Sequence, residues 1–248
     1  MSVSLWKNIG QTPWDVVEAY RKEHGIDKSV KICYTGRLDP MAQGVLPILI
    51  GDECKKMDDH LSRDKTYSAE AVLGISTDTY DPMGLITNTE ELTAERIDKF
   101  KEQLLALSGK TFKQYFPPYS AYLLRKGATK APLWWWAMND RLDEIKDLMP
   151  SKDVTVYSCE ITDQRTVSLV DYVKTITDEI RLVKEGTNFR QDEIIVKWNE
   201  FLKAQSEMTL TVISFTAKVS TGTYIRSLVN DIGIPTHAHL ITRTEYHS

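Results

Sequence analysis

Three segments that lie far apart in the sequence contain polar side chains able to carry chemistry. The first is GRLDPMAQGVLPILIG, residues 36–51, in which Asp39 lies on a tight turn between an apolar strand and a glycine-bounded strand. A carboxylate in such a place is a candidate for catalysis. An aspartate before a proline can equally do no more than cap the turn, because Pro40 fixes the next φ angle. Asp39 alone does not decide between these interpretations.

The second segment, KTYSAEAVLG, alternates apolar and polar residues and predicts a strand. On a strand, Tyr67 shares one face with Ala69, Ala71 and Leu73 and points into packed, mostly apolar surroundings. A tyrosine in that position is usually part of the core, with its hydroxyl hydrogen-bonded.

The third segment, STGTYIRSLVNDIG, places Tyr224 and Arg226 two residues apart behind Gly222. The two side chains share a face if the segment is extended and diverge if it is helical. Arg226 could also be an ordinary surface charge.

The sequence predicts neither a metal site nor a disulfide. The acidic turn TDTYDPMG lacks the ligand spacing of a calcium loop, and side-chain turns explain it better. The C-terminal histidines have no accompanying pattern of acids or cysteines, and the cysteines lie far apart. The residues considered are Asp78, Asp81, His237, His239 and His247, with Cys33, Cys54 and Cys159.

The elements that must position these residues mix strands and helices without strict βαβ alternation. This favours an α+β fold with a mostly antiparallel or mixed sheet. Strands are expected near residues 30–34, 45–50, 66–73, 154–161 and 208–219, and helices near residues 12–25, 94–107, 133–148, 167–185, 192–205 and after 222.

Composition places the chain among globular proteins. Of 248 residues, 42% are hydrophobic and 27% charged, and 31 basic against 35 acidic residues give a net charge of −4. Any nucleic-acid site must therefore be local. No apolar run approaches the roughly 20 residues of a membrane helix, and no leader is recognisable, so a cytoplasmic location is expected. Phosphate-loop, dinucleotide-binding, zinc-protease and serine-hydrolase motifs are absent from the sequence.

Taken in order, the motifs resemble the TruB family of pseudouridine synthases. The series is GRLDPMAQGVLPILIG with DECKK, KTYSAEAVLG with TDTYDPMG, FPPYSA, and STGTYIRSLVNDIG. The opening GQTPWDVVEAYRKEHG is similar to that family's start. The resemblance covers roughly residues 6–162 and 208–244, and four ordered motifs are far more specific than one.

The resemblance implies a curved mixed sheet flanked by helices, with a central cleft for RNA. It also implies isomerisation of a uridine in a structured RNA, favouring the T-loop of tRNA, without metal or organic cofactor. A stacked base must first be extruded into a pocket. By position, Asp39 matches the catalytic aspartate, Arg226 its paired arginine, and Tyr67 the aromatic that stacks on the flipped base.

Three further residues are expected to bind substrate: Tyr224, a second pocket tyrosine, with Lys65 and Tyr34. Tyr34 stands where bacterial members usually have a histidine that enters the RNA loop, and an aromatic ring can still stack there. Two other positions depart from the family. Arg37 replaces a small residue or threonine, and Thr221 replaces a lysine, which predicts fewer phosphate contacts.

We expect a single catalytic domain over residues 1–248, a monomer, with no room for the small C-terminal RNA-binding domain of many relatives. Residues 163–207 predict an inserted helical pair that packs on the sheet, with an RNA clamp or a protein interface as alternatives. At least one of Trp134, Trp135 and Trp136 should be exposed, because on a helix they face different directions. The alternative function is an RNA-binding or folding factor with the same scaffold and little dependence on catalysis.

Overall fold

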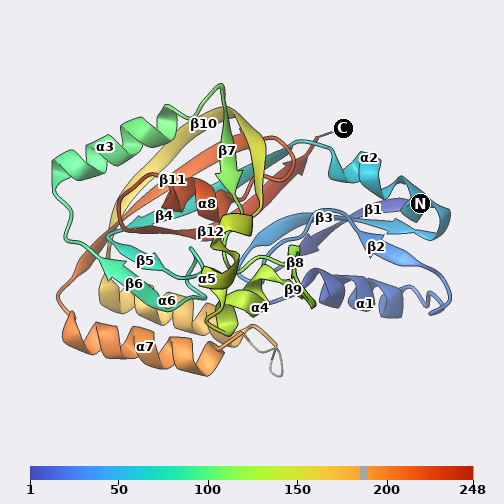
Figure 1. Cartoon of the computed structure of the whole chain (residues 1–248), viewed down its shortest axis with the longest axis horizontal. Helices are drawn as coiled ribbons and strands as arrows, with labels where there is room; N and C mark the ends of the chain where they lie inside the picture. The colour runs from blue at the N-terminus through green and yellow to red at the C-terminus, as the bar shows by residue number, and fades with distance from the viewer. Residues whose placement is uncertain (185–188, 248) are drawn as a thin grey trace.

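The computed structural model describes residues 1–184 and 189–247, and these build an eight-stranded mixed sheet (Figure 1). The order along the sheet is β1-β3-β12-β4-β11-β10-β7, and β2 pairs with β3. β12 runs parallel to β3, whereas the other pairs are antiparallel. The strands are β1 (Ser2–Lys7), β2 (Ile32–Tyr34), β3 (Gln43–Ile50), β4 (Lys65–Leu73), β7 (Lys110–Tyr115), β10 (Ser151–Ser168), β11 (Thr209–Val219) and β12 (Thr236–Tyr246).

Two small hairpins and a set of helices surround this sheet. The hairpins are β5 (Ile75–Thr77) with β6 (Ile86–Thr89), and β8 (Leu123–Lys126) with β9 (Thr129–Pro132). The helices are α1 (Pro13–Glu23), α2 (Met57–Leu61), α3 (Ala94–Leu105), α4 (Leu133–Met138), α5 (Leu142–Ile145), α6 (Leu169–Arg181), α7 (Gln191–Ala204) and α8 (Ile225–Asn230), with short 3-10 turns η1 (Gly51–Lys56) and η2 (Lys146–Leu148). The predicted α+β class with a mixed sheet is confirmed.

Both faces of the sheet are buried, because successive side chains of a strand point to opposite sides. On β4 and β11, Ala71 and Phe215 pack with α3 and α8, and this cluster also contains Tyr67. Val72 and Val212 point to the other face and pack against α6 and α7. Figure 1 shows α6 and α7 side by side below the sheet. The two amphipathic patterns therefore do pack on the sheet, and their status as an insertion stays a prediction.

Two sequence predictions were wrong in extent. The helix expected over residues 133–148 is broken into α4, α5 and η2, because Asp140 adopts a left-handed conformation with φ +53°. The strand expected over residues 154–161 is longer, and residues 163–168, assigned to the helical insertion, continue β10 in its pairing with β11. The helix expected over 167–185 is α6, Leu169–Arg181, and residue 185 lies outside the described residues.

The three consecutive tryptophans differ in exposure, as predicted. Trp136 is fully buried and donates its Nε1–H to the carbonyl oxygen of Ala131. Trp135 is partly buried, and Trp134 is 41% exposed. α4 thus anchors itself through Trp136 and leaves Trp134 on the surface.

A polar network is buried between β12 and α6. His237 is fully buried; its Nδ1–H donates to the carbonyl oxygen of Ile75, and its Nε2 accepts from the Tyr172 hydroxyl. Burial lowers the pKa of His237 to about 4. Nearby His239 lies between Glu179 at 2.9 Å and Glu70 at 3.3 Å. Burial works to lower the pKa of His239, but the two carboxylates outweigh it and raise that pKa.

The folded-state pKa of His237 predicts acid sensitivity. An unfolded histidine takes up a proton near pH 6.5, whereas His237 stays neutral until about pH 4. Its contribution to stability is therefore complete above pH 6.5 and lost as the pH falls towards 4. We expect His237→Gln to remove about 2 kcal/mol of the fall in unfolding free energy between pH 7 and 4.5. Urea unfolding of both proteins across this range measures the difference, and parallel curves would contradict it.

Candidate active site

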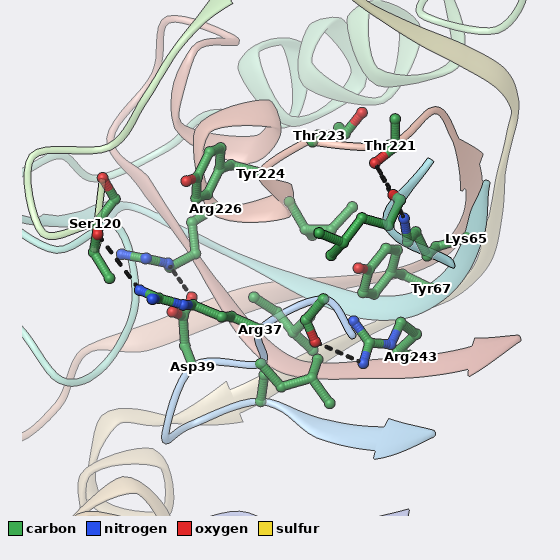
Figure 2. Close-up of a pocket in the computed structure, with 18 of the residues that line it drawn as sticks. Arg37, Asp39, Lys65, Tyr67, Ser120, Thr221, Thr223, Tyr224, Arg226 and Arg243 are labelled. Atoms are coloured by element: carbon green, nitrogen blue, oxygen red, sulfur yellow. Dashed lines mark hydrogen bonds and ion pairs between the residues drawn. The ribbon is translucent and has the colours of Figure 1, made fainter. Parts of the chain in front are cut away.

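Five of the six predicted site residues line one cavity of about 360 Å³, the first cavity (Figure 2). They come from four distant parts of the chain: the loop between β2 and β3, the strand β4, the turn after β11, and the helix α8. The five residues are Asp39, Lys65, Tyr67, Tyr224 and Arg226. The sixth, Tyr34, lines an adjoining second cavity of about 530 Å³, to which Asp39 and Arg226 also belong.

Asp39 and Arg226 form an ion pair at the junction of the two cavities. The Nε–H of Arg226 donates to Asp39 Oδ2 at 2.8 Å. The Arg226 side chain is only 4% exposed, whereas that of Asp39 is 41% exposed. No hydrogen bond reaches Asp39 Oδ1 from the described residues 1–184 and 189–247, so this oxygen is free to face a substrate. The interpretation of Arg226 as a surface charge is wrong.

Two backbone carbonyls accept further hydrogen bonds from Arg226. Its guanidinium donates to the carbonyl oxygens of Thr79 at 2.6 Å and Tyr119 at 3.4 Å. Those two residues belong to the TDTYDPMG and FPPYSA segments. Arg226 therefore joins all the motif regions around one carboxylate, and its planar group has little freedom to turn.

A second carboxylate, Asp81, faces the same guanidinium and was missed as a site residue. Its Oδ2 lies 3.7 Å from Arg226 Nε, and its Oδ1 accepts from the Thr79 hydroxyl at 2.7 Å and the Met83 amide at 2.9 Å. Burial raises the pKa of Asp81, although Arg226 opposes this. The expected side-chain turn is therefore present, but the same residue also supports Arg226. The TDTYDPMG motif was the sequence signal from which Asp81 could have been identified as a site residue.

The two tyrosines form apolar walls of the first cavity. Tyr67 is 8% exposed and belongs to the core cluster around Ala69, yet Figure 2 shows its ring at the cavity. The Tyr67 side chain is thus both part of the hydrophobic core and part of the cavity wall. Tyr224 packs against Phe116 with ring centroids 5.0 Å apart. Burial, with a smaller contribution from Asp39, raises the pKa of Tyr224.

The backbone of Tyr224 is held by a buried glutamine. The amide N–H of Tyr224 donates to Gln114 Oε1 at 2.8 Å, and Gln114 Nε2 donates back to the Tyr224 carbonyl oxygen at 3.1 Å. Tyr224 is extended and immediately precedes α8, so Arg226 lies in the first helical turn. The segment is therefore extended at Tyr224 and helical at Arg226, whereas the sequence analysis considered a wholly extended or a wholly helical segment. Both side chains line the cavity.

Lys65 lines the first cavity, but its ammonium group already donates hydrogen bonds to protein atoms. Nζ donates to the carbonyl oxygens of Leu61 at 3.0 Å and of Arg63, and to the Thr221 hydroxyl at 3.2 Å. Burial, reinforced by Arg243, lowers the pKa of Lys65 to about 8. An ammonium has three donors, and three acceptors are present. A direct contact between Lys65 and a substrate stays a prediction.

Two buried cations hold the loop that contains Asp39, and no sequence pattern marked them. Lys7 is fully buried and its Nζ donates to the carbonyl oxygens of Ala42 at 2.5 Å and Pro40 at 3.4 Å. Burial lowers the pKa of Lys7 to about 8. Arg243 donates to the carbonyl oxygens of Val45 at 2.8 Å and Gly36 at 3.1 Å. The loop is thus fixed on both sides of Asp39.

Lys152 brings a positive charge to the turn in which Thr221 replaces the family's lysine. Its Nζ donates to the Thr221 carbonyl oxygen at 2.8 Å. The side chain crosses Gly222, where an added Cβ would lie 2.8 Å from Nζ. Thr221 and Gly222 line the first cavity, and Lys152 itself is exposed. A cation therefore remains at this rim, supplied by β10.

Within residues 1–184 and 189–247, no group of three or more histidines, cysteines, aspartates or glutamates is arranged to hold a metal ion. In the same part of the chain, no helix is long and apolar enough to cross a membrane. The predicted absence of a cofactor is not tested by these findings.

Comparison with known families and proteins agrees with the site. The family described as "TruB family pseudouridylate synthase (N terminal domain)" matches residues 22–175. A "tRNA pseudouridine synthase B" of Clostridium kluyveri is 30% identical over 240 residues, covering 93% of this chain and 60% of that protein. Its namesake in Caldanaerobacter subterraneus subsp. tengcongensis is 30% identical over 247 residues, covering 98% and 67%. The chain thus spans about three-fifths of the length of the curated relatives.

Solved structures support the fold at lower sequence identity. A Cbf5-Nop10-Gar1 complex contains a similar chain with a TM-score of 0.54 and 19% identity, over 98% of this chain and 48% of that one. An H/ACA RNP bound to a substrate RNA gives a TM-score of 0.53 and 18% identity, over 99% and 47%. The family match over residues 22–175, the relatives at 30% identity and the shared fold agree with the motifs gathered around Asp39, and the chain belongs to the TruB family of pseudouridine synthases.

Proposed function

We propose that this protein converts a uridine in a structured RNA to pseudouridine, and that its target is the T-loop uridine of tRNA. The observation that carries the proposal is the half-exposed Asp39 carboxylate, paired with buried Arg226 at 2.8 Å and facing a cavity walled by Tyr67 and Tyr224. The tRNA target is supported by relatives called tRNA pseudouridine synthase B. The cytoplasmic location, the monomeric state and the single domain stay predictions.

The first cavity suits an extruded base. Unstacking a base from an RNA loop costs a few kcal/mol, and stacking on an aromatic face recovers about 1–3 kcal/mol. Tyr67 supplies such a face beside the carboxylate. Because Arg226 engages Oδ2, Oδ1 can approach the sugar or the ring, either as a nucleophile or as a base.

The proposed reaction is an isomerisation, so its atoms balance without an external reagent. The bond from N1 of the base to C1′ of the ribose breaks, the base turns and a bond from C5 to C1′ forms. One proton leaves C5 and one proton is taken up at N1. The Asp39 carboxylate offers its Oδ1 to these steps, because the Nε–H of Arg226 engages its Oδ2 at 2.8 Å.

The first prediction concerns Asp39 itself. Asp39→Asn keeps the shape and removes the charge, so we expect turnover to fall at least about a thousandfold, with RNA binding nearly unchanged. The measurement is pseudouridine formation in a tRNA transcript, mapped by carbodiimide modification and primer extension, beside equilibrium binding.

Asp153→Asn is the matched control, because Asp153 is an exposed carboxylate on β10 that lines neither cavity. It should behave as wild type. Wild-type turnover by Asp39→Asn would contradict the chemistry. RNA binding without turnover in both wild type and Asp39→Asn would support a binding or folding factor instead.

The second prediction concerns Asp81. In Asp81→Asn the Arg226 guanidinium keeps one carboxylate partner, Asp39, instead of two. Its positive charge then acts on the Asp39 carboxylate alone, and this makes Asp39 Oδ1 a weaker nucleophile or base. We expect kcat to fall about tenfold while the KM for RNA changes little. A changed KM at constant kcat would show that Asp81 acts on binding instead.

The third prediction concerns Lys152. If its ammonium meets an RNA phosphate at the rim of the first cavity, Lys152→Met removes one released counterion. The slope of log affinity against log salt should then become shallower by about 0.7–0.9. Lys28→Met is the control, because Lys28 is exposed and lines neither cavity. Equal slopes for the two variants would exclude the contact.

A further inference from the structure

The turn between β5 and β6, residues 78–85, supports Arg226 at two positions. The carbonyl oxygen of Thr79 accepts from the guanidinium at 2.6 Å, and Asp81 Oδ2 lies 3.7 Å from Arg226 Nε. The two-stranded hairpin that carries this turn is not part of the main sheet. The distance between the turn and Arg226 therefore depends on the elements that pack against the turn.

The helix α7 contacts this turn at two residues, each next in sequence to one that supports Arg226. Arg190, directly before α7, pairs with Asp78 at 2.9 Å. The Nε1–H of Trp198 donates to the carbonyl oxygen of Pro82 at 3.2 Å. The Arg190 side chain is only 15% exposed and Trp198 is fully buried. Both contacts are thus withdrawn from competing water.

Arg190 contacts both segments whose carbonyl oxygens accept from Arg226. Besides pairing with Asp78, its guanidinium lies over the Tyr119 ring, 4.6 Å from the ring centroid. The Tyr119 hydroxyl donates to Asp78 at 3.1 Å, and the Tyr119 carbonyl oxygen accepts from Arg226 at 3.4 Å. Arg190, Asp78 and Tyr119 form a closed set of contacts, which we call the Arg190 cluster. A shift of this cluster moves the acceptors that orient Arg226.

The start of α7 is held in one position by the packing of the helix. Ile194 and Trp198 are fully buried in the cluster on the lower face of the sheet, and the Trp198 ring lies 6.0 Å from that of Tyr172 on α6. Arg190 itself has a left-handed backbone with φ +60°. That conformation is uncommon for a residue with a side chain and persists where the surroundings hold it.

α7 lies within residues 163–207, to which the resemblance described above does not extend, and beyond residues 22–175, which match the family. The Arg190 cluster nevertheless joins it to the TDTYDPMG and FPPYSA motifs. A helix outside the motifs therefore contacts two of them beside the ion pair.

We propose that Arg190 is a positioning residue for the reaction: through Asp78 and Tyr119 it holds the two carbonyl oxygens that orient the Arg226 guanidinium on Asp39. The proposal deepens the function proposed above and rests on it, because Asp39 is the reacting group. A misplacement of about 1 Å in an active site can cost about a hundredfold in rate. Loosening one support of Arg226 should cost part of that.

The first measurement compares kcat with KM in Arg190→Met, which keeps an unbranched apolar chain and removes the guanidinium. We expect kcat for pseudouridine formation in a tRNA transcript to fall about tenfold, while KM changes less than about twofold. Arg181→Met is the matched control, because Arg181 is an exposed arginine of α6 that pairs with Asp178 and lines neither cavity. It should behave as wild type.

A double-mutant cycle tests whether Arg190 acts through Asp78. Asp78→Asn keeps the shape of the side chain and removes its charge, so we expect a similar fall in kcat. The double variant should lose no more than the larger single loss, because both changes break the same contact. Should Arg190→Met not give the circular-dichroism spectrum of the folded protein, Asp78→Asn carries the comparison with wild type.

The second measurement follows Arg226 directly and needs no turnover. In ¹⁵N-arginine-labelled protein, the buried Nε–H of Arg226 that donates to Asp39 should give a slowly exchanging NMR signal. The signal is assigned by its loss in Arg226→Lys. In Arg190→Met and in Asp78→Asn we expect this signal to shift and to exchange faster with water, whereas Arg181→Met should leave it unchanged.

Each outcome has one meaning. An unchanged Arg226 signal, an unchanged kcat, or single losses that multiply in the double variant would each refute the role of Arg190. Because Arg190 also lines the second cavity, a raised KM at constant kcat would show that it contacts RNA instead. If wild type forms no pseudouridine but the Arg226 signal responds as expected, the proposed function is wrong and the hold of Arg190 on Arg226 stands.

Discussion

A half-exposed carboxylate beside a buried guanidinium is the interaction on which the site depends. Removing the partner of a buried charge costs about 3–5 kcal/mol, and Arg226 is almost fully buried while Asp39 is not. The ion pair therefore stabilises Arg226 more than it stabilises Asp39. Asp81 and two backbone carbonyls keep Arg226 in place. The second oxygen of Asp39 therefore stays open to the first cavity, while a guanidinium that other protein groups hold in place engages the first oxygen.

The same logic extends to the loop that contains Asp39. Lys7 and Arg243 are buried charged groups that donate to carbonyl oxygens of that loop rather than to acids. Such contacts satisfy the backbone of an irregular segment that has no strand partners of its own. Lys7 comes from the edge strand β1 and Arg243 from β12, which lies inside the sheet. The backbone on both sides of the carboxylate is thus tied to two strands of the sheet.

Part of the fold and of the candidate site could be predicted from the sequence, because the signals lie within short stretches of neighbouring residues. Asp39, Tyr67, Tyr224 and Arg226 lie in ordered motifs, so their family and their meeting in one cavity followed from resemblance. Alternation and periodicity indicated β3, β4, part of β10, β11, α6 and α7, but not the long strand β12. Asp81 was assigned to its turn alone, because a contact across the fold leaves no spacing signal. Lys7 and Arg243 bind carbonyl oxygens, which every residue possesses, and the left-handed Asp140 that divides α4 from α5 is visible only in the backbone.

The departures from the family form one pattern when their positions are compared. Thr221 removes a lysine from the turn after β11, and Lys152 reaches the same turn from β10. Tyr34 stands where the family usually has a histidine, and the second cavity that it lines also contains Arg37, Trp134 and Phe189. Charge and aromatic surface around the ion pair are therefore supplied by several elements of this chain. A binding surface tolerates such exchange because a phosphate or a base can be reached from several sides, whereas the carboxylate and its guanidinium must meet at one distance and one angle.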